Sequence, residues 1–251
     1  DAHEALINDA AARHGSSSFS RTNLQSVQHP HQSPLSSGLS MTDSLSLYLA
    51  SKSPRRKAIL EQLGFTPIVI ADLTQTLGHF QGDEEPLANE APQDYVERIA
   101  REKILQAFEK LQRKSLCSLP VLSADTTVIC ANQILGKPRD EDEAKSFLRL
   151  LSGRSHEVRT AVCVGLNKDD WKMQLSVSEV HFKELSEEEI NAYVRFAEPY
   201  DKAGGYGIQG LAGAFITEIR GSYSGIMGLP IYETCALLKD YGLDLFNNKV
   251  R

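Results

Sequence analysis

The sequence lacks the features that mark several large classes of protein. Its 251 residues include only four cysteines, with no CxxC pair and no cysteine–histidine cluster, so it predicts neither a zinc site nor a disulfide framework. Its 27 basic residues are outnumbered by 33 acidic ones, and the net charge of −6 disfavours a sequence-independent nucleic-acid binder. No run approaches the roughly 20 apolar residues of a membrane-spanning helix. We therefore expect a cytoplasmic protein that binds neither nucleic acid nor a membrane.

Residues 1–40 differ in composition from the rest of the chain. They contain nine serines and no sustained apolar period, although the whole sequence has an ordinary 41% of hydrophobic residues. Such a segment cannot bury enough apolar surface to offset the entropy lost on ordering. We expect residues 1–40 to be a disordered extension or a remnant of expression, with an organelle-targeting segment as the less favoured alternative. Residues 41–251 are expected to form a single domain.

Strand-like and helix-like segments alternate from Leu45 onward. This alternation predicts a mixed α/β fold. The expected strands cover 47–50, 67–71, 120–124, 127–131, 156–166, 171–183 and 213–219, and the expected helices cover 54–64, 93–112, 141–151 and 186–196 and begin again at 230.

Two arginines stand at the start of the first expected helix. Ser53 suits the N-cap and Pro54 the first helical position, so Arg55 and Arg56 fall in the first turn, where the helix dipole disfavours cations. An anion bound at this helix N-terminus would resolve the conflict, because backbone N–H groups and guanidinium forks would converge on it. The alternative is a pair of solvated arginines on an exposed turn.

A lysine, an aspartate and a second lysine form the next group of candidates. Lys103 lies on the apolar stripe of the helix 93–112, where a lysine either extends to the edge or reaches an anion in a cleft. Asp125 follows an apolar strand and is expected at the carboxyl edge of the sheet, where Mg²⁺ takes carboxylate oxygens. Lys137 lies between a glycine and a proline, so it is a single cation with a fixed place in the chain and not part of a run of charged residues. The alternative for Asp125 is a residue that forms a turn.

The segment 198–210 is rich in glycine. Its four glycines indicate unusual backbone angles or the close approach of another group, but their spacing matches no known phosphate-binding glycine motif. Gln209 carries an amide that donates and accepts hydrogen bonds, which suits recognition of the edge of a base. The alternative is a flexible surface loop.

Taken together, seven segments in chain order resemble the Maf family of nucleoside triphosphate pyrophosphatases, which is related in fold to the inosine triphosphate pyrophosphatases. The matching segments are LASKSPRRKAILEQLG (49–64), DYVERIAREK (94–103), SADTTV (123–128), LGKPRDEDEA (135–144), LSGRSHEVRT (151–160), EPYDKAGGYGIQG (198–210) and FITEIRGSYSGIMGLPIYET (215–234).

The resemblance implies a mixed twisted sheet with flanking helices and a central substrate cleft. It implies hydrolysis of a nucleoside triphosphate between the α and β phosphates, with a divalent metal (Mg²⁺, or Mn²⁺ or Co²⁺) and a homodimeric assembly. Asp125 matches the family's catalytic aspartate, a metal ligand and the proton acceptor for the attacking water. The residues that match phosphate-handling and substrate-binding positions are Lys103, Lys137, Ser51, Arg55, Arg56 and Lys202.

The second metal-side carboxylate of the family has a less direct match. The family carries an acidic pair soon after the second strand, whereas here the acids are displaced along a lengthened loop. Counting back from Asp94 favours Glu84 as a catalytic residue and metal ligand. Asp72 and Glu85 stay open as alternatives.

Three positions favour one branch of the family. Arg55, Thr126 and Gln209 resemble the branch that acts on dTTP and UTP, which would also accept modified pyrimidine triphosphates and keep aberrant nucleotides out of nucleic acid. One alternative is an enzyme of the same family that acts on 7-methyl-GTP. The other is a nucleotide-sensing regulator of septum formation with little turnover, which would need the cations but not the pair of carboxylates.

Overall fold

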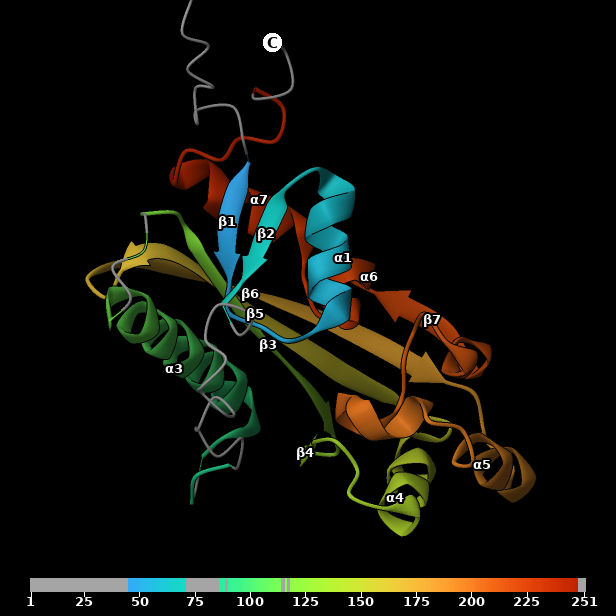
Figure 1. Ribbon diagram of the computed structural model, residues 1–251. Helices are drawn as coiled ribbons and strands as arrows, with labels where there is room; N and C mark the ends of the chain where they lie inside the picture. The colour runs from blue at the N-terminus through green and yellow to red at the C-terminus, as the bar shows by residue number, and fades with distance from the viewer. Residues whose placement is uncertain (1–44, 71–85, 89, 114–115, 117, 248–251) are drawn as a thin grey trace, which may run out of the picture. The chain divides into compact units, whose positions relative to one another are not determined.

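The computed structural model describes residues 45–70, 86–88, 90–113, 116 and 118–247 (Figure 1). The strands are β1 (Ser46–Leu49), β2 (Thr66–Val69), β3 (Val121–Cys130), β4 (Gln133–Leu135), β5 (Ser155–Asn167), β6 (Asp170–Phe182) and β7 (Ile216–Arg220). The α-helices are α1 (Pro54–Leu63), α3 (Pro92–Arg113), α4 (Glu141–Leu151), α5 (Glu187–Tyr193), α6 (Tyr223–Met227) and α7 (Ile231–Asp240). Three short 3₁₀ helices follow α5: η1 (Glu198–Asp201), η2 (Ala203–Gly205) and η3 (Leu211–Phe215).

The strands form one mixed sheet, which confirms the predicted α/β class. Its order is β2-β1-β3-β5-β6-β7, and β4 pairs with the end of β3. The β1–β2 and β1–β3 pairs are parallel, whereas β3–β4, β3–β5, β5–β6 and β6–β7 are antiparallel. Strand β3 therefore joins the parallel part of the sheet to its antiparallel part, which includes the long β5–β6 hairpin (Figure 1).

Helices cover both faces of the parallel part of the sheet because successive side chains of a strand point to opposite faces. Leu47 and Leu49 pack in one apolar cluster with buried residues of α1 and α7. Tyr48 and Ala50 pack in another cluster with the apolar stripe of α3. Figure 1 shows α3 and α1 on opposite sides of β1 and β3. The sheet is thus the middle of three layers, and its two faces bear different functional side chains.

The prediction of two separate strands at 120–124 and 127–131 was wrong, because β3 is continuous. The polar residues at Asp125 and after it interrupt the apolar pattern that the prediction followed. Strand β5 pairs with β3 without a break from Val121 to Ile129. These cross-strand hydrogen bonds hold Asp125 in an extended conformation despite the low strand propensity of aspartate.

The expected helices are present, and each begins within one residue of its predicted start. Helix α1 has Ser53 as its N-cap and ends at Gly64, whose φ of 91° is left-handed. Helix α5 opens on the predicted capping box between Ser186 and Glu189, although it ends three residues before the predicted limit of 196. The short elements β4 and α6 and the three 3₁₀ helices were not predicted.

Two further predictions concern the division of the chain into a segment 1–40 and a domain 41–251, and the lack of a membrane-spanning helix. Every described residue lies within the predicted domain 41–251, and the segment 1–40 lies outside, so the proposed division of the chain stays a prediction. In the described part of the chain, no helix is long and apolar enough to cross a membrane.

Candidate active site

A cleft of about 860 Å³ opens where one edge of β3 has no neighbouring strand among the described residues. Strand β1 pairs with β3 only as far as Leu122, and β4 begins its pairing at Val128. Between these two points the cleft has access to side chains from both faces of the sheet. Its volume falls within the range of sites that hold a nucleotide-sized ligand.

The face of β3 that packs on α3 contributes a carboxylate–lysine pair. Ser123 donates a hydrogen bond from its hydroxyl to the carbonyl of Ala100 in α3, at 3.0 Å. Asp125, two residues further along the strand, points to the same face, where its Oδ1 lies 2.6 Å from Nζ of Lys103. The two side chains are only 12% and 15% exposed. The lysine on the apolar stripe therefore reaches an anion in a cleft, which was one of the two outcomes considered for it.

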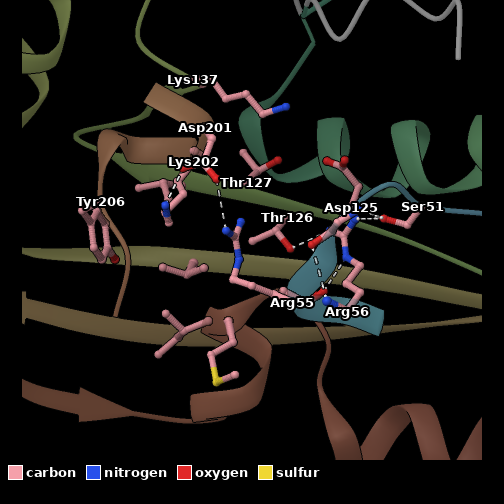
Figure 2. A pocket seen from close by; sticks show the side chains of 18 of the residues that line it. Ser51, Arg55, Arg56, Asp125, Thr126, Thr127, Lys137, Asp201, Lys202 and Tyr206 are labelled. Atoms are coloured by element: carbon pink, nitrogen blue, oxygen red, sulfur yellow. Dashed lines mark hydrogen bonds and ion pairs between the residues drawn. The ribbon is translucent and has the colours of Figure 1, made fainter. Parts of the chain in front are cut away.

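On the opposite face of the sheet, Arg56 of α1 forms side-chain hydrogen bonds with three separate segments of the chain. Its Nη1 donates to Oγ of Ser51 at 3.0 Å, its Nη2 to Oγ1 of Thr126 at 3.1 Å, and its Nε to the carbonyl of Gly228 at 2.7 Å. Thr126 in turn lies 2.9 Å from the hydroxyl of Thr160 on β5. Protein oxygens therefore already accept from this guanidinium, and Arg56 fastens the turn before α1 to β3 and to the end of α6 (Figure 2).

Arg55 points to the glycine-rich segment across the cleft (Figure 2). Its Nη1 lies 3.4 Å from Oδ2 of Asp201, and Lys202 binds the other carboxylate oxygen. Lys202 also donates to the carbonyl of Glu198 at 3.0 Å. Burial acts to raise the pKa of Asp201, but Lys202 and Arg55 outweigh burial and hold this pKa below its ordinary value. The carboxylate thus stays ionised and holds two cations beside each other.

Lys137 and Gln209 complete the lining from two exposed positions. Lys137 follows β4 and has no hydrogen-bond or ionic partner among the described residues. Gln209 lies on the glycine-rich segment. Both side chains are therefore available to a ligand in the cleft.

A half-buried carboxylate organises the glycine-rich segment. Glu198 accepts hydrogen bonds from the backbone amides of Leu211 and Ala212, at 2.8 and 3.2 Å, and from the hydroxyl of Tyr193 at 2.9 Å. Burial opposes ionisation, but these bonds and Lys202 keep the pKa of Glu198 below its usual value. A Cβ added at Gly210 would lie 2.1 Å from Oε2 of Glu198, so the close approach requires glycine there. The segment thus contains short 3₁₀ helices tied together by hydrogen bonds, and is not an irregular loop throughout.

The cleft brings together all the predicted site residues that the structure describes. These are Ser51, Arg55, Arg56, Lys103, Asp125, Thr126, Lys137, Lys202 and Gln209. The predicted second carboxylate, Glu84, and its alternatives Asp72 and Glu85 lie outside the described residues. Asp201 and Tyr206 also line the cleft; both belong to the segment 198–210, but the sequence pattern predicted no role for either.

The charge of the cleft is opposite to that of the chain. Its lining has six basic side chains (Lys52, Arg55, Arg56, Lys103, Lys137 and Lys202) and two acidic ones (Asp125 and Asp201), whereas the whole chain carries −6. Low-dielectric walls concentrate such a field inside a cleft. The arrangement therefore suits a polyanionic ligand.

The described residues give a divalent metal one carboxylate in the basic part of the cleft. They contain no group of three or more His, Cys, Asp or Glu side chains that could hold a metal ion. Mg²⁺ keeps several waters and commonly binds one or two carboxylates together with substrate phosphates. Asp125, whose side chain is slightly open to the cleft, fits this mode of binding as one ligand.

The chain is similar in sequence to a known protein family and to several named bacterial proteins. The family model described as "Maf-like protein" matches residues 46–241. A dTTP/UTP pyrophosphatase of Pasteurella multocida (strain Pm70) is 48% identical over 212 residues, which cover 82% of this chain and 100% of that protein. A nucleoside triphosphate pyrophosphatase of Haemophilus ducreyi is 48% identical over 199 residues, covering 79% and 96% of the two chains.

One solved structure gives a weaker likeness. The Ham1 protein of Staphylococcus aureus matches with a TM-score of 0.41 and 10% identity, over 78% of this chain and 97% of that one. A likeness of this size carries no argument about function.

Proposed function

The chain belongs to the family of Maf-like proteins, and on this premise we propose that it is a nucleoside triphosphate pyrophosphatase that hydrolyses dTTP and UTP. The products would be the nucleoside monophosphate and pyrophosphate. The single observation that supports this proposal most is the basic cleft, in which a carboxylate is held against a lysine at 2.6 Å. A polyanion needs the basic lining, and hydrolysis in addition needs a base.

In the proposed mechanism, Asp125 accepts the proton of the water that attacks the α-phosphorus. Lys103 binds Oδ1 of this carboxylate, so we assign the proton to Oδ2. Lys137 and Arg55 stabilise the negative charge on the phosphate oxygens and on the leaving pyrophosphate. Ser51 and Lys202 complete the binding of the phosphates, and Arg56 holds the hydroxyl of Ser51 in place from behind.

A divalent cation, Mg²⁺ or alternatively Mn²⁺ or Co²⁺, would be held by Asp125 and, as the sequence predicts, by Glu84. When bound, such a cation neutralises charge on the phosphate oxygens and makes a bound water more acidic. The residues of this chain still determine where the triphosphate lies and which group receives the proton.

The preference for dTTP and UTP is supported by two independent observations. Two of the most similar relatives carry these nucleotides in their names. Arg55, Thr126 and Gln209, the three positions that favoured this branch, all line the cleft. Modified pyrimidine triphosphates would fit the same site, in keeping with a role in removing aberrant nucleotides. The proposal includes the predicted homodimer and cytoplasmic location.

The proposed function is tested by measuring pyrophosphate release from purified protein with dTTP, UTP, dCTP, ATP, GTP and 7-methyl-GTP, with and without Mg²⁺. We expect metal-dependent release that is fastest with dTTP and UTP. Faster release from 7-methyl-GTP would keep the reaction and overturn the proposed branch. Tight binding of dTTP without release of pyrophosphate from any nucleotide would favour the nucleotide-sensing regulator.

A further inference from the structure

One wall of the cleft is apolar, in contrast to the charged lining around Asp125. Six residues that line the cleft also belong to, or pack against, a single buried cluster: Val128, Leu135, Val158, Ala203, Tyr206 and Ile226. We call them the apolar wall. Figure 2 shows Tyr206 on the opposite side of the pocket from Ser51 and Asp125, with Arg55 between them. A triphosphate held by the basic side chains would therefore bring its nucleoside to this wall.

Tyr206 is fixed from behind by a buried histidine that the proposed mechanism does not use. The hydroxyl of Tyr206 lies 2.6 Å from Nε2 of His156 on β5, and His156 is only 3% exposed. The rings of His156, Tyr206 and Phe182 contact one another edge to face, with centroids 4.9 to 5.4 Å apart. Nδ1 of His156 has no partner among the described residues, so its bond to Tyr206 is its polar anchor.

The backbone around Tyr206 gives a reason for this anchor. Gly204 and Gly205, which precede it, have φ values of 73° and 68°, and Gly207 follows it. Glycine is more permissive in conformation than any other residue, so its neighbours do not fix the position of a side chain between them. The position of the Tyr206 ring therefore depends on its side-chain contacts. Among these contacts, the hydrogen bond to His156 is the one that fixes the direction in which the ring points.

The protonation states of the pair suit a permanent hydrogen bond. Burial lowers the pKa of His156 to about 4, with a smaller contribution from His181, and burial raises the pKa of Tyr206 above its usual value. At neutral pH both side chains are thus uncharged, and the bond between them does not depend on pH in that range.

From this geometry we infer that His156 and Tyr206 are positioning residues for the nucleoside: their hydrogen bond sets the apolar wall and the segment that carries Gln209 against the base and sugar. The inference rests on the proposed function, because it assigns the nucleoside end of the same cleft. Among the described residues, the pair forms no hydrogen bond or ion pair with the side chains proposed to bind phosphate, so we expect it to act on nucleoside affinity and not on phosphate affinity.

The test is binding of two products, dTMP and pyrophosphate, measured separately by titration calorimetry. Pyrophosphate reports only the phosphate end of the cleft, whereas dTMP also reports the nucleoside end. Tyr206→Phe and His156→Leu each remove the hydrogen bond, and we expect them to weaken dTMP binding by about 3- to 10-fold, the size of one hydrogen bond. Pyrophosphate binding should change by less than twofold.

Two further variants separate positioning from a general loss of structure. The amide of a glutamine reaches the place of Nε2, so His156→Gln should restore dTMP affinity to near the wild-type value. The double variant Tyr206→Phe/His156→Leu should be no weaker than either single variant, because both remove the same bond. Tyr241→Phe, which removes a hydroxyl that bonds to Asp170 outside the cleft, is the matched control and should leave both affinities unchanged.

Equal losses of dTMP and pyrophosphate binding, or unchanged dTMP binding in Tyr206→Phe, would overturn the inference. These measurements do not require turnover. A wild-type protein that binds both products but releases no pyrophosphate from dTTP would contradict the proposed function alone. A wild-type protein that binds neither product would contradict both.

Discussion

At the scale of single residues, the charged side chains of the cleft fall into two groups. Lys103 and Asp125 hold each other, and Arg56 is held by oxygens of the protein. Lys137, in contrast, has no partner among the residues that the structure describes. The first group is positioned before a ligand arrives, which lowers the cost of organising charge around a transition state.

The pairing of Lys103 with Asp125 gives the first prediction. Lys103→Met keeps an unbranched side chain that is one atom shorter and removes its charge, so the carboxylate loses the cation that orients it. We expect kcat/KM for dTTP to fall by about 10²-fold or more, the size of a lost electrostatic contact in an active site. Lys239→Met on α7, outside the cleft lining, is the control and should retain wild-type turnover. A Lys103→Met enzyme within threefold of wild type would show that the pair has no role in the reaction.

The buried histidine gives a second prediction, about stability and pH. The pKa of His156 is lowered by burial from 6.5 to about 4 in the folded chain. Between these two values the unfolded chain takes up a proton that the folded chain does not, so the free energy of unfolding falls as the pH is lowered from 6.5 to 4. The contribution totals about 3 kcal/mol. Urea unfolding at several pH values should therefore show a shallower loss in His156→Gln than in the wild type, and parallel curves would contradict the assignment.

At the scale of elements, the sequence indicated the helices better than the strands. Helices α1 and α5 carry their start signals locally, in the caps Ser53 and Ser186, so a single sequence reveals them. The continuity of β3 depends instead on pairing with β5, which lies more than 20 residues further along the chain. The five-residue helix α6 and the three-residue strand β4 are too short for any periodic pattern to appear.

The glycine-rich segment yields a prediction at the same scale. Gly210→Ala would place its Cβ 2.1 Å from Oε2 of Glu198 and would displace the carboxylate that binds two backbone amides. We expect the free energy of unfolding to fall by about 1 to 3 kcal/mol. The matched control is Gly136→Ala, because a Cβ at Gly136 would meet no atom within 4 Å. Equal stability of the two variants in urea unfolding would show that the contact with Glu198 does not shape the segment.

At the scale of the whole molecule, the cleft concentrates positive charge on a chain with a net charge of −6. Most of the site could be predicted from the sequence because its residues lie in short contiguous segments. Some of these segments also contain residues that disfavour the local structure, such as the two arginines at the start of a helix. The histidine–tyrosine pair could not, since the two residues are 50 positions apart and meet only when Tyr206, just after η2, reaches His156 on β5. The same holds for the bond from Arg56 to Gly228, which spans 172 residues.

The division of the chain gives a prediction about its N-terminal segment. The serine-rich composition of residues 1–40 predicts that they contribute nothing to the folded domain. A variant that begins at Met41 should therefore have the same Tm and the same kcat/KM for dTTP as the full chain. A Tm lower by several degrees, or a loss of turnover, would show that the segment belongs to the domain.

The central claim is that Asp125 makes this basic cleft a pyrophosphatase. The most direct test compares pyrophosphate release from dTTP by the wild type, Asp125→Asn and the control Asp169→Asn, an exposed aspartate between β5 and β6. We predict rapid release by the wild type and the control, and a loss of about 10²-fold or more in Asp125→Asn with its Tm preserved. Turnover by a folded Asp125→Asn protein within threefold of the wild type would contradict the claim.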